Sequence, residues 1–163
     1  MTGLVSTIPG AVQTLTGYMT AVASQYPDLN IGVYTGQPIS AVANNFMMVG
    51  HYEDGSLITE AKYAWAGMPV TSKVRYEEYA LQGTIRAWTG SNDPSGTIAN
   101  AFLLSDALQE QIVSDPGGSG TISPSGSWGE YTTTMEACGP LDGRGWGVVL
   151  AFTLEVLNVR LIG

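Results

Sequence analysis

Apolar residues recur along the first segment of the chain at the spacing of a helix. Six of them, separated by steps of four, three, four, three and four residues, form one stripe: Ile8, Val12, Leu15, Met19, Val22 and Tyr26. Thr7 stands before the stripe as an N-cap residue, and Pro9 lies in the first turn, where proline is tolerated. Because Pro27 blocks continuation, the pattern predicts a helix over residues 8–25.

Strand patterns account for much of the remaining chain. Short apolar runs predict strands at 30–34 and 45–52. Alternation predicts a longer strand at 76–88, with one face formed by Tyr79, Leu81, Ile85 and Ala87 and the other by Glu78, Gln82, Thr84 and Arg86. That alternation is typical of a strand with one face on the core and one face outside. A closing pair of strands is predicted at 128–137 and 146–160, and the second of these is apolar on both faces near its start, which favours a central position in the sheet.

A second helix is predicted between these groups of strands. Apolar residues line a broad face of residues 98–114, with Ser95 or Thr97 expected as its cap, and Pro116 ends it. Residues 117–126 (GGSGTISPSG) follow as a low-complexity segment and are expected to form a flexible connector.

The predicted order is therefore α-β-β-β-α-β-β within a single domain spanning residues 1–163. Two helices with apolar stripes, packed on one face of a mainly antiparallel sheet, make an α+β fold. The other face of the sheet is then left to solvent or to another chain. The low charge of the predicted strands favours another chain.

Composition and charge narrow the classes of function. Hydrophobic residues make up 44% of the chain and charged residues only 12%, about half the charged share of an ordinary soluble domain. A weakly charged surface is typical of a protein covered by other subunits. The formal net charge of −8, with Lys and Arg scattered along the chain, disfavours a protein that grips nucleic acid, although DNA can slide past an acidic surface without binding.

Targeting and redox signals add little. No apolar run approaches the roughly 20 residues of a membrane span. The first residues lack the basic region of a secretory signal, so we expect a protein made in a cytoplasm. The single cysteine excludes an internal disulfide.

Candidate catalytic groups are sparse. His51 and Cys138, the only histidine and cysteine, would have to meet through the fold to form a nucleophile–base pair. A metal site from His51 with Glu53 and Asp54 has suitable ligand types but no diagnostic spacing. We interpret Cys138 and His51 as structural, and we predict no catalytic residue, no metal and no cofactor.

Aromatic residues give a clearer signal. Tyr63, Trp65 and Met68 fall in an irregular stretch between residues 53 and 74 that has no clean period. Large apolar residues in such a segment either tuck under the core or meet a partner, and both interpretations stay open. For residues 117–126, an interface and a disordered linker likewise stay open.

The succession of elements resembles the tail terminator (tail completion) proteins of long-tailed siphophages, particularly those of actinobacterial phages. The resemblance covers nearly the whole chain and lies in four features. These are the leading helix that ends at Tyr26-Pro27, the short strand at 31–34, the strand 79–90 (YALQGTIRAWTG) with its glycine-aromatic end, and the closing segment 145–156 (GWGVVLAFTLEV) after the second helix.

The resemblance implies a structural virion protein at the junction of tail and neck, assembled in the host cytoplasm. Such proteins form a hexameric ring that caps the tail tube, stops its polymerisation and meets a head-side stopper or connector protein, while DNA passes through the channel without specific binding. No enzyme activity, cofactor or membrane is involved. On this view Tyr63, Trp65 and Met68 are interface candidates. The alternatives are another neck or tail component, such as a stopper or tube protein, and a small host binding module.

Overall fold

The computed structural model describes residues 5–38, 43–52, 54–65, 74–90, 94–122, 125–140 and 145–162. Along these residues the chain forms two α-helices, one short 3-10 helix and six strands. In order they are α1 (Ile8–Gln25), η1 (Pro27–Leu29), β1 (Ile31–Thr35), β2 (Asn45–Val49), β3 (Lys62–Trp65), β4 (Val74–Thr89), α2 (Pro94–Val113), β5 (Ser127–Pro140) and β6 (Trp146–Ile162).

The strands form one mainly antiparallel sheet, so the predicted α+β class is confirmed. The described strands follow the order β1-β2-β4-β6-β5, with β3 paired to β4 beside that path and β1 parallel to β2. The predicted order of elements holds apart from β3, which lies within the stretch that was expected to be irregular. β6 runs between β4 and β5, as its two apolar faces predicted.

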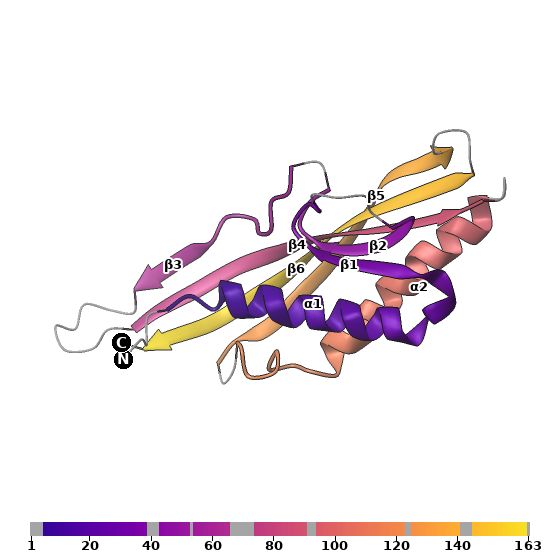
Figure 1. The fold of residues 1–163 in the computed structure, drawn as a ribbon. Helices are drawn as coiled ribbons and strands as arrows, with labels where there is room; N and C mark the ends of the chain where they lie inside the picture. Colours follow the sequence, from indigo (N-terminus) through magenta and orange to yellow (C-terminus); the bar gives the residue numbers. More distant parts are fainter. Residues whose placement is uncertain are drawn as a thin grey trace.

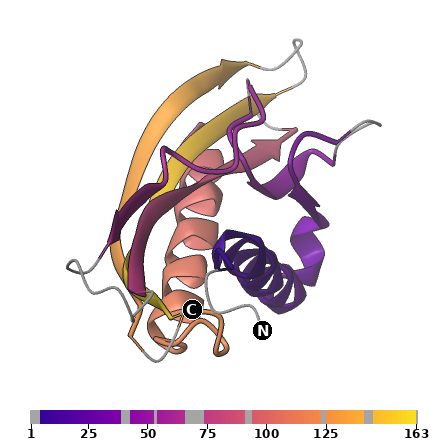
Figure 2. The ribbon, with the colours of Figure 1, turned by 90° about the vertical axis from the view of Figure 1, so that its left-hand side faces the viewer.

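Both helices lie against the concave face of the curved sheet (Figures 1 and 2). The apolar stripe of α1 is buried, from Val12 through Val22, and so is the alternating set of β4 that includes Leu81 and Ile85. Gly83 leaves room on this face for the ring of Phe152, because a Cβ at that position would overlap the ring. The core therefore lies between the helices and the middle of β4 and β6.

The N-termini of the two helices differ from the predicted capping. Thr7 occupies the N-cap position of α1 as predicted, but its side chain makes no cap hydrogen bond. α2 begins at Pro94, so neither Ser95 nor Thr97 stands before it as a cap. Thr97 is instead buried, with its hydroxyl oxygen 2.6 Å from that of Thr89.

Residues 117–126, expected to be a flexible connector, contain turns that pack on the domain through Gly118, Thr121 and Ile122, while Ser119, Gly120 and Ser125 are exposed. Backbone hydrogen bonds close successive turns between Gly117 and Ile122. Ile122 is 1% exposed and belongs to the core, and the hydroxyl of Thr121 lies 3.0 Å from that of Thr14 on α1. The segment therefore covers one side of α1.

β2 and β3 share the same edge of β4. β2 pairs with residues 83–86, β3 pairs with residues 75–78, and Ile58 forms an isolated bridge to Leu81 between them. The chain leaves this edge after β2 and returns before Leu57, and we call the segment between them the excursion. Both ends of the excursion bind the backbone of Gln82. The Gly50 N–H donates to the Gln82 carbonyl, and the Gln82 N–H donates to the Leu57 carbonyl. This arrangement extends the sheet with β3 at one end.

Candidate functional site

The end of the sheet that carries β3 is open to solvent. In Figure 1, β3 and the adjoining ends of β4 and β6 extend beyond the first turn of α1. All four side chains of β3 are exposed, with Tyr63 at 44% and Trp65 at 62%. Among the described strands β3 pairs with β4 alone, so its other edge presents backbone N–H and C=O groups.

Arg75 lies against both aromatic rings of β3. Arg75 lies on β4, and the antiparallel register places it directly opposite Trp65 of β3. Its guanidinium carbon is 4.4 Å from the centre of the Tyr63 ring and 5.9 Å from that of Trp65, within the range of cation–π attraction. The two rings are thus held in place by a half-buried cation, which distinguishes them from freely moving surface side chains.

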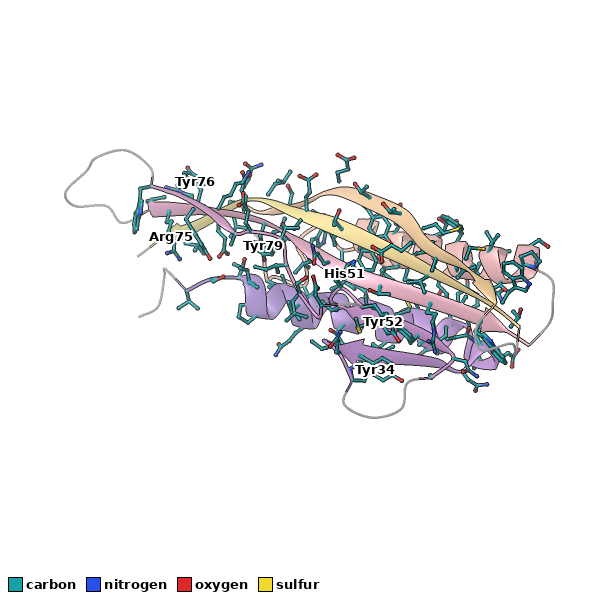
Figure 3. All side chains as sticks on the ribbon, turned by 90° about the horizontal axis from the view of Figure 1, so that it is seen from above. Tyr34, His51, Tyr52, Arg75, Tyr76 and Tyr79 are labelled. Atoms are coloured by element: carbon teal, nitrogen blue, oxygen red, sulfur yellow. The ribbon has the colours of Figure 1, made fainter. Side chains whose placement is uncertain are left out.

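The opposite face of this end carries further basic and aromatic groups. Tyr76 is 39% exposed and has Ala64 of β3 and Arg160 of β6 as its cross-strand neighbours. Figure 3 shows Arg75 and Tyr76 at the same end of the sheet, well away from His51. We define the projecting end by its exposed or half-exposed aromatic and basic residues: Lys62, Tyr63, Trp65, Arg75, Tyr76 and Arg160.

A buried carboxylate fixes the base of the projecting end. Glu77 is fully buried on the helix side of β4. It accepts hydrogen bonds from the Ser6 hydroxyl, from the Thr7 backbone N–H at 2.9 Å and from the Thr7 hydroxyl at 2.7 Å. The start of α1 is thereby tied to the strand that carries Arg75.

The same hydrogen bonds set the ionisation of Glu77. Burial alone would raise the pKa of this carboxyl, but hydrogen bonds from Ser6, Thr7 and Tyr63 outweigh burial and hold the pKa below its ordinary value. Next to it, burial raises the pKa of Tyr79 to about 12, and the Tyr79 hydroxyl lies 2.9 Å from that of Thr7. An ionised carboxylate with satisfied oxygens is consistent with a structural role.

Two of the three predicted interface residues lie together at this end. Tyr63 and Trp65 share one face of β3, while Met68 lies outside the described residues. The sequence alone did not predict that Arg75 packs against these rings, or that Tyr76 and Arg160 lie on the other face of the same end. The alternation within 76–88 was the available signal, but it gives no register between β4 and β3.

His51 belongs to a second cluster, on the outer face of the sheet. Its Nε2 lies 2.9 Å from a carboxylate oxygen of Glu136 on β5, and its Nδ1 lies 3.7 Å from Asp54. His51 thus reaches across β4 and β6 to β5. It lines a pocket of about 230 Å³ together with outer-face residues such as Thr132, Thr134 and Thr153. Hydrogen bonds from Ser56 lower the pKa of Asp54, with a smaller contribution from His51.

This second cluster gives little basis for chemistry. Cys138 lies two residues beyond Glu136 on β5, and its side chain is exposed. Glu53 lies outside the described residues, and no group of three or more His, Cys, Asp or Glu side chains in the described part is placed to hold a metal ion. Neither α-helix of the described chain is long and apolar enough to cross a membrane.

Comparison with models of known protein families finds no match to this sequence, and neither does comparison with curated proteins. The projecting end combines an open strand edge, two fixed aromatic rings and a cation, and this combination suits contact with another protein.

Proposed function

We propose that this chain is a structural virion subunit that forms a ring, caps the tail tube of a long-tailed phage and joins the tail to the head-side connector. The observation that carries the proposal is the projecting end, where Tyr63 and Trp65 are held by Arg75 outside the core. The resemblance of the chain to tail terminator proteins supplies the identity of the assembly and its hexameric number.

Physical chemistry supports an assembly role for this end. Trp, Tyr and Arg are the residue types that contribute most to binding energy at protein interfaces. A free strand edge also tends to pair with another chain unless it is covered or blocked by charge. β3 carries a single charged side chain, Lys62, and leaves both aromatic rings in reach of a partner.

The overall charge suits a subunit around a DNA channel. The net charge of −8 disfavours tight binding of phosphates, and the basic residues are too few to neutralise a run of them. A ring that lets DNA pass needs such a surface. The proposal therefore assigns recognition to copies of this chain, the tube protein and the connector, with no bond made or broken.

Assembly on purified tail tubes tests the proposal. We expect light scattering to show a hexamer, or a monomer that becomes a ring when tubes are added, and we expect tube elongation to stop once it binds. A protein that stays monomeric and never joins tubes would reject the proposal. Turnover of a small molecule that is lost when His51 or Cys138 is replaced would also reject it.

A further inference from the structure

The outer face of α2 has an unusual composition for a helix in contact with water. Phe102 and Leu103 are 39% and 40% exposed, and Val113 near the end of the helix is 79% exposed. Asp106 and Glu110, also exposed, lie between them at steps of three or four residues, so all five side chains share one side of the helix. We call these five residues the α2 face.

A surface helix normally turns its apolar residues inward and its polar residues outward. α2 does bury one side, including Leu104 and Leu108, against the sheet. The apolar residues of the α2 face are therefore a second set, beyond those that the fold uses. A mixed apolar and acidic surface of this kind suits a partner with aromatic rings and positive charge.

The projecting end has that complementary composition. Of the six basic residues, Lys73 and Arg144 lie outside the described residues, and three of the remaining four belong to the projecting end: Lys62, Arg75 and Arg160. α2 contains no Lys or Arg between Pro94 and Val113 and carries two carboxylates on its exposed side. The carboxylates near this end have partners within it. Glu60 lies 3.8 Å from the Lys62 ammonium, Glu78 accepts a hydrogen bond from the Asn158 backbone N–H, and Glu77, next to Arg75 on the same side of β4, is fully buried.

We propose that the projecting end of one copy docks on the α2 face of the next copy. In this contact Arg75 approaches Asp106 and Glu110, while the rings of Tyr63 and Trp65 cover Phe102 and Leu103. The inference rests on the proposed ring function and deepens it, because it assigns the two halves of the contact between neighbouring subunits.

Two features favour a second copy as the occupant. Both complementary surfaces belong to the same chain, and they lie on different parts of the molecule: the projecting end is on β3 and the ends of β4 and β6, whereas α2 follows the opposite end of β4 (Figure 1). A contact between two different patches is head-to-tail, and such contacts close into rings when the rotation between copies allows it.

Charge reversal on each side tests the contact. One variant carries Arg75→Glu, and the other carries Asp106→Lys with Glu110→Lys. Each alone brings like charges together, so we expect self-association, measured by sedimentation velocity and by ring formation on tail tubes, to weaken at least about tenfold. In an equimolar mixture each reversed surface meets an opposite charge, so we expect alternating rings and association within about threefold of wild type.

Control variants separate contact effects from folding and net charge. Arg75→Gln removes the positive charge at the contact without adding a negative one, and it replaces Arg75→Glu if that variant does not fold. Asp28→Lys with Glu130→Lys changes the net charge by the same amount as the α2 variant, at exposed positions on other elements, and should associate like wild type.

The outcomes are distinguishable. If wild type associates and the α2 variant associates equally well, the α2 contact is wrong while the ring function stands. If each variant fails alone and the mixture also fails, the two surfaces do not meet each other, and the pairing is again overturned. If wild type associates neither in solution nor on tubes, the ring function falls and the contact falls with it.

Discussion

The two parts of β4 place their side chains in different surroundings, one in the core and one at the surface. In its middle and C-terminal part the alternating residues are buried under the helices, and Gly83 admits the Phe152 ring so closely that no larger residue fits. At its N-terminal end the strand places half-buried Arg75 against the exposed rings of β3 and exposes Tyr76 on the other face. One strand thus serves both folding and, on our proposal, assembly, with Glu77 at the boundary.

Gly83→Ala should have the largest effect on folding. The added Cβ would overlap the ring of Phe152, a rigid side chain that is 2% exposed. Overpacking of this kind costs about 3 kcal/mol of unfolding free energy. Urea denaturation measures it.

The same substitution at Gly17 is the matched control. Gly17 lies inside α1, and a Cβ there would meet no atom within 4 Å. Alanine favours a helix interior over glycine by roughly 1 kcal/mol, so Gly17→Ala should stabilise the protein. Equal effects at the two glycines would show that the middle of β4 is not the tightly packed region that the comparison requires.

Glu77→Gln should lower the unfolding free energy by about 2 kcal/mol, less than Gly83→Ala. The substitution leaves hydroxyl and N–H donors from Ser6 and Thr7 facing an amide in place of a carboxylate. Glu60→Gln, at an exposed position just before β3, is the control and should change stability little. A cost confined to Glu77 would place the boundary between the folded core and the projecting end at this residue.

The pH dependence of stability gives an independent check on Glu77. Its pKa is lower in the folded protein than the ordinary value of 4.5, so ionisation stabilises the fold fully above pH 4.5, and this stabilisation is lost as the pH falls toward the folded pKa. Wild type should therefore lose stability below pH 4.5 more steeply than Glu77→Gln. Parallel curves for the two proteins would mean that Glu77 contributes no linked protonation.

Trp65→Ala should affect assembly far more than folding. The ring is 62% exposed and makes cross-strand contact with Arg75, so its loss should cost about 1 kcal/mol of unfolding free energy or less. A tryptophan at the centre of an interface contributes about 2 kcal/mol or more to binding, so ring formation should weaken more than tenfold. Tyr52→Ala, which removes a 38% exposed ring away from the projecting end, is the control.

Local signals in the sequence were enough for much of the fold. α1 occupies residues 8–25 as predicted, because its stripe, Thr7 and Pro27 all lie within a few residues of one another. The 76–88 pattern correctly identified Leu81 and Ile85 as core residues of β4. These predictions depend on side-chain period and chain-breaking residues, which any short window of sequence contains.

The missed features depend on partners that are distant in sequence. β3 is four residues long and exposed throughout, so its strand conformation comes from pairing with β4 and leaves no alternation to detect. The hydrogen bonds of Glu77 span about 70 residues, and that between His51 and Glu136 spans 85. Tyr63 and Trp65 stood out by composition alone, whereas the role of Arg75 needed the register between two strands.

His51→Gln should have the smallest effect on folding and gives a test of how far the assembly surface extends. His51 and Glu136 are partly exposed, with side-chain exposures of 24% and 32%, and pairs of this kind are worth about 0.5 kcal/mol. The substitution should therefore leave urea denaturation nearly unchanged, and Glu136→Gln should behave alike. Because His51 lies on the outer face of the sheet, opposite the core face of β4 and well away from the projecting end (Figure 3), ring formation should also be unchanged. A His51→Gln protein that folds normally but fails to form rings would extend the assembly surface along the outer face, and the division of β4 into a folding part and an assembly part would no longer hold.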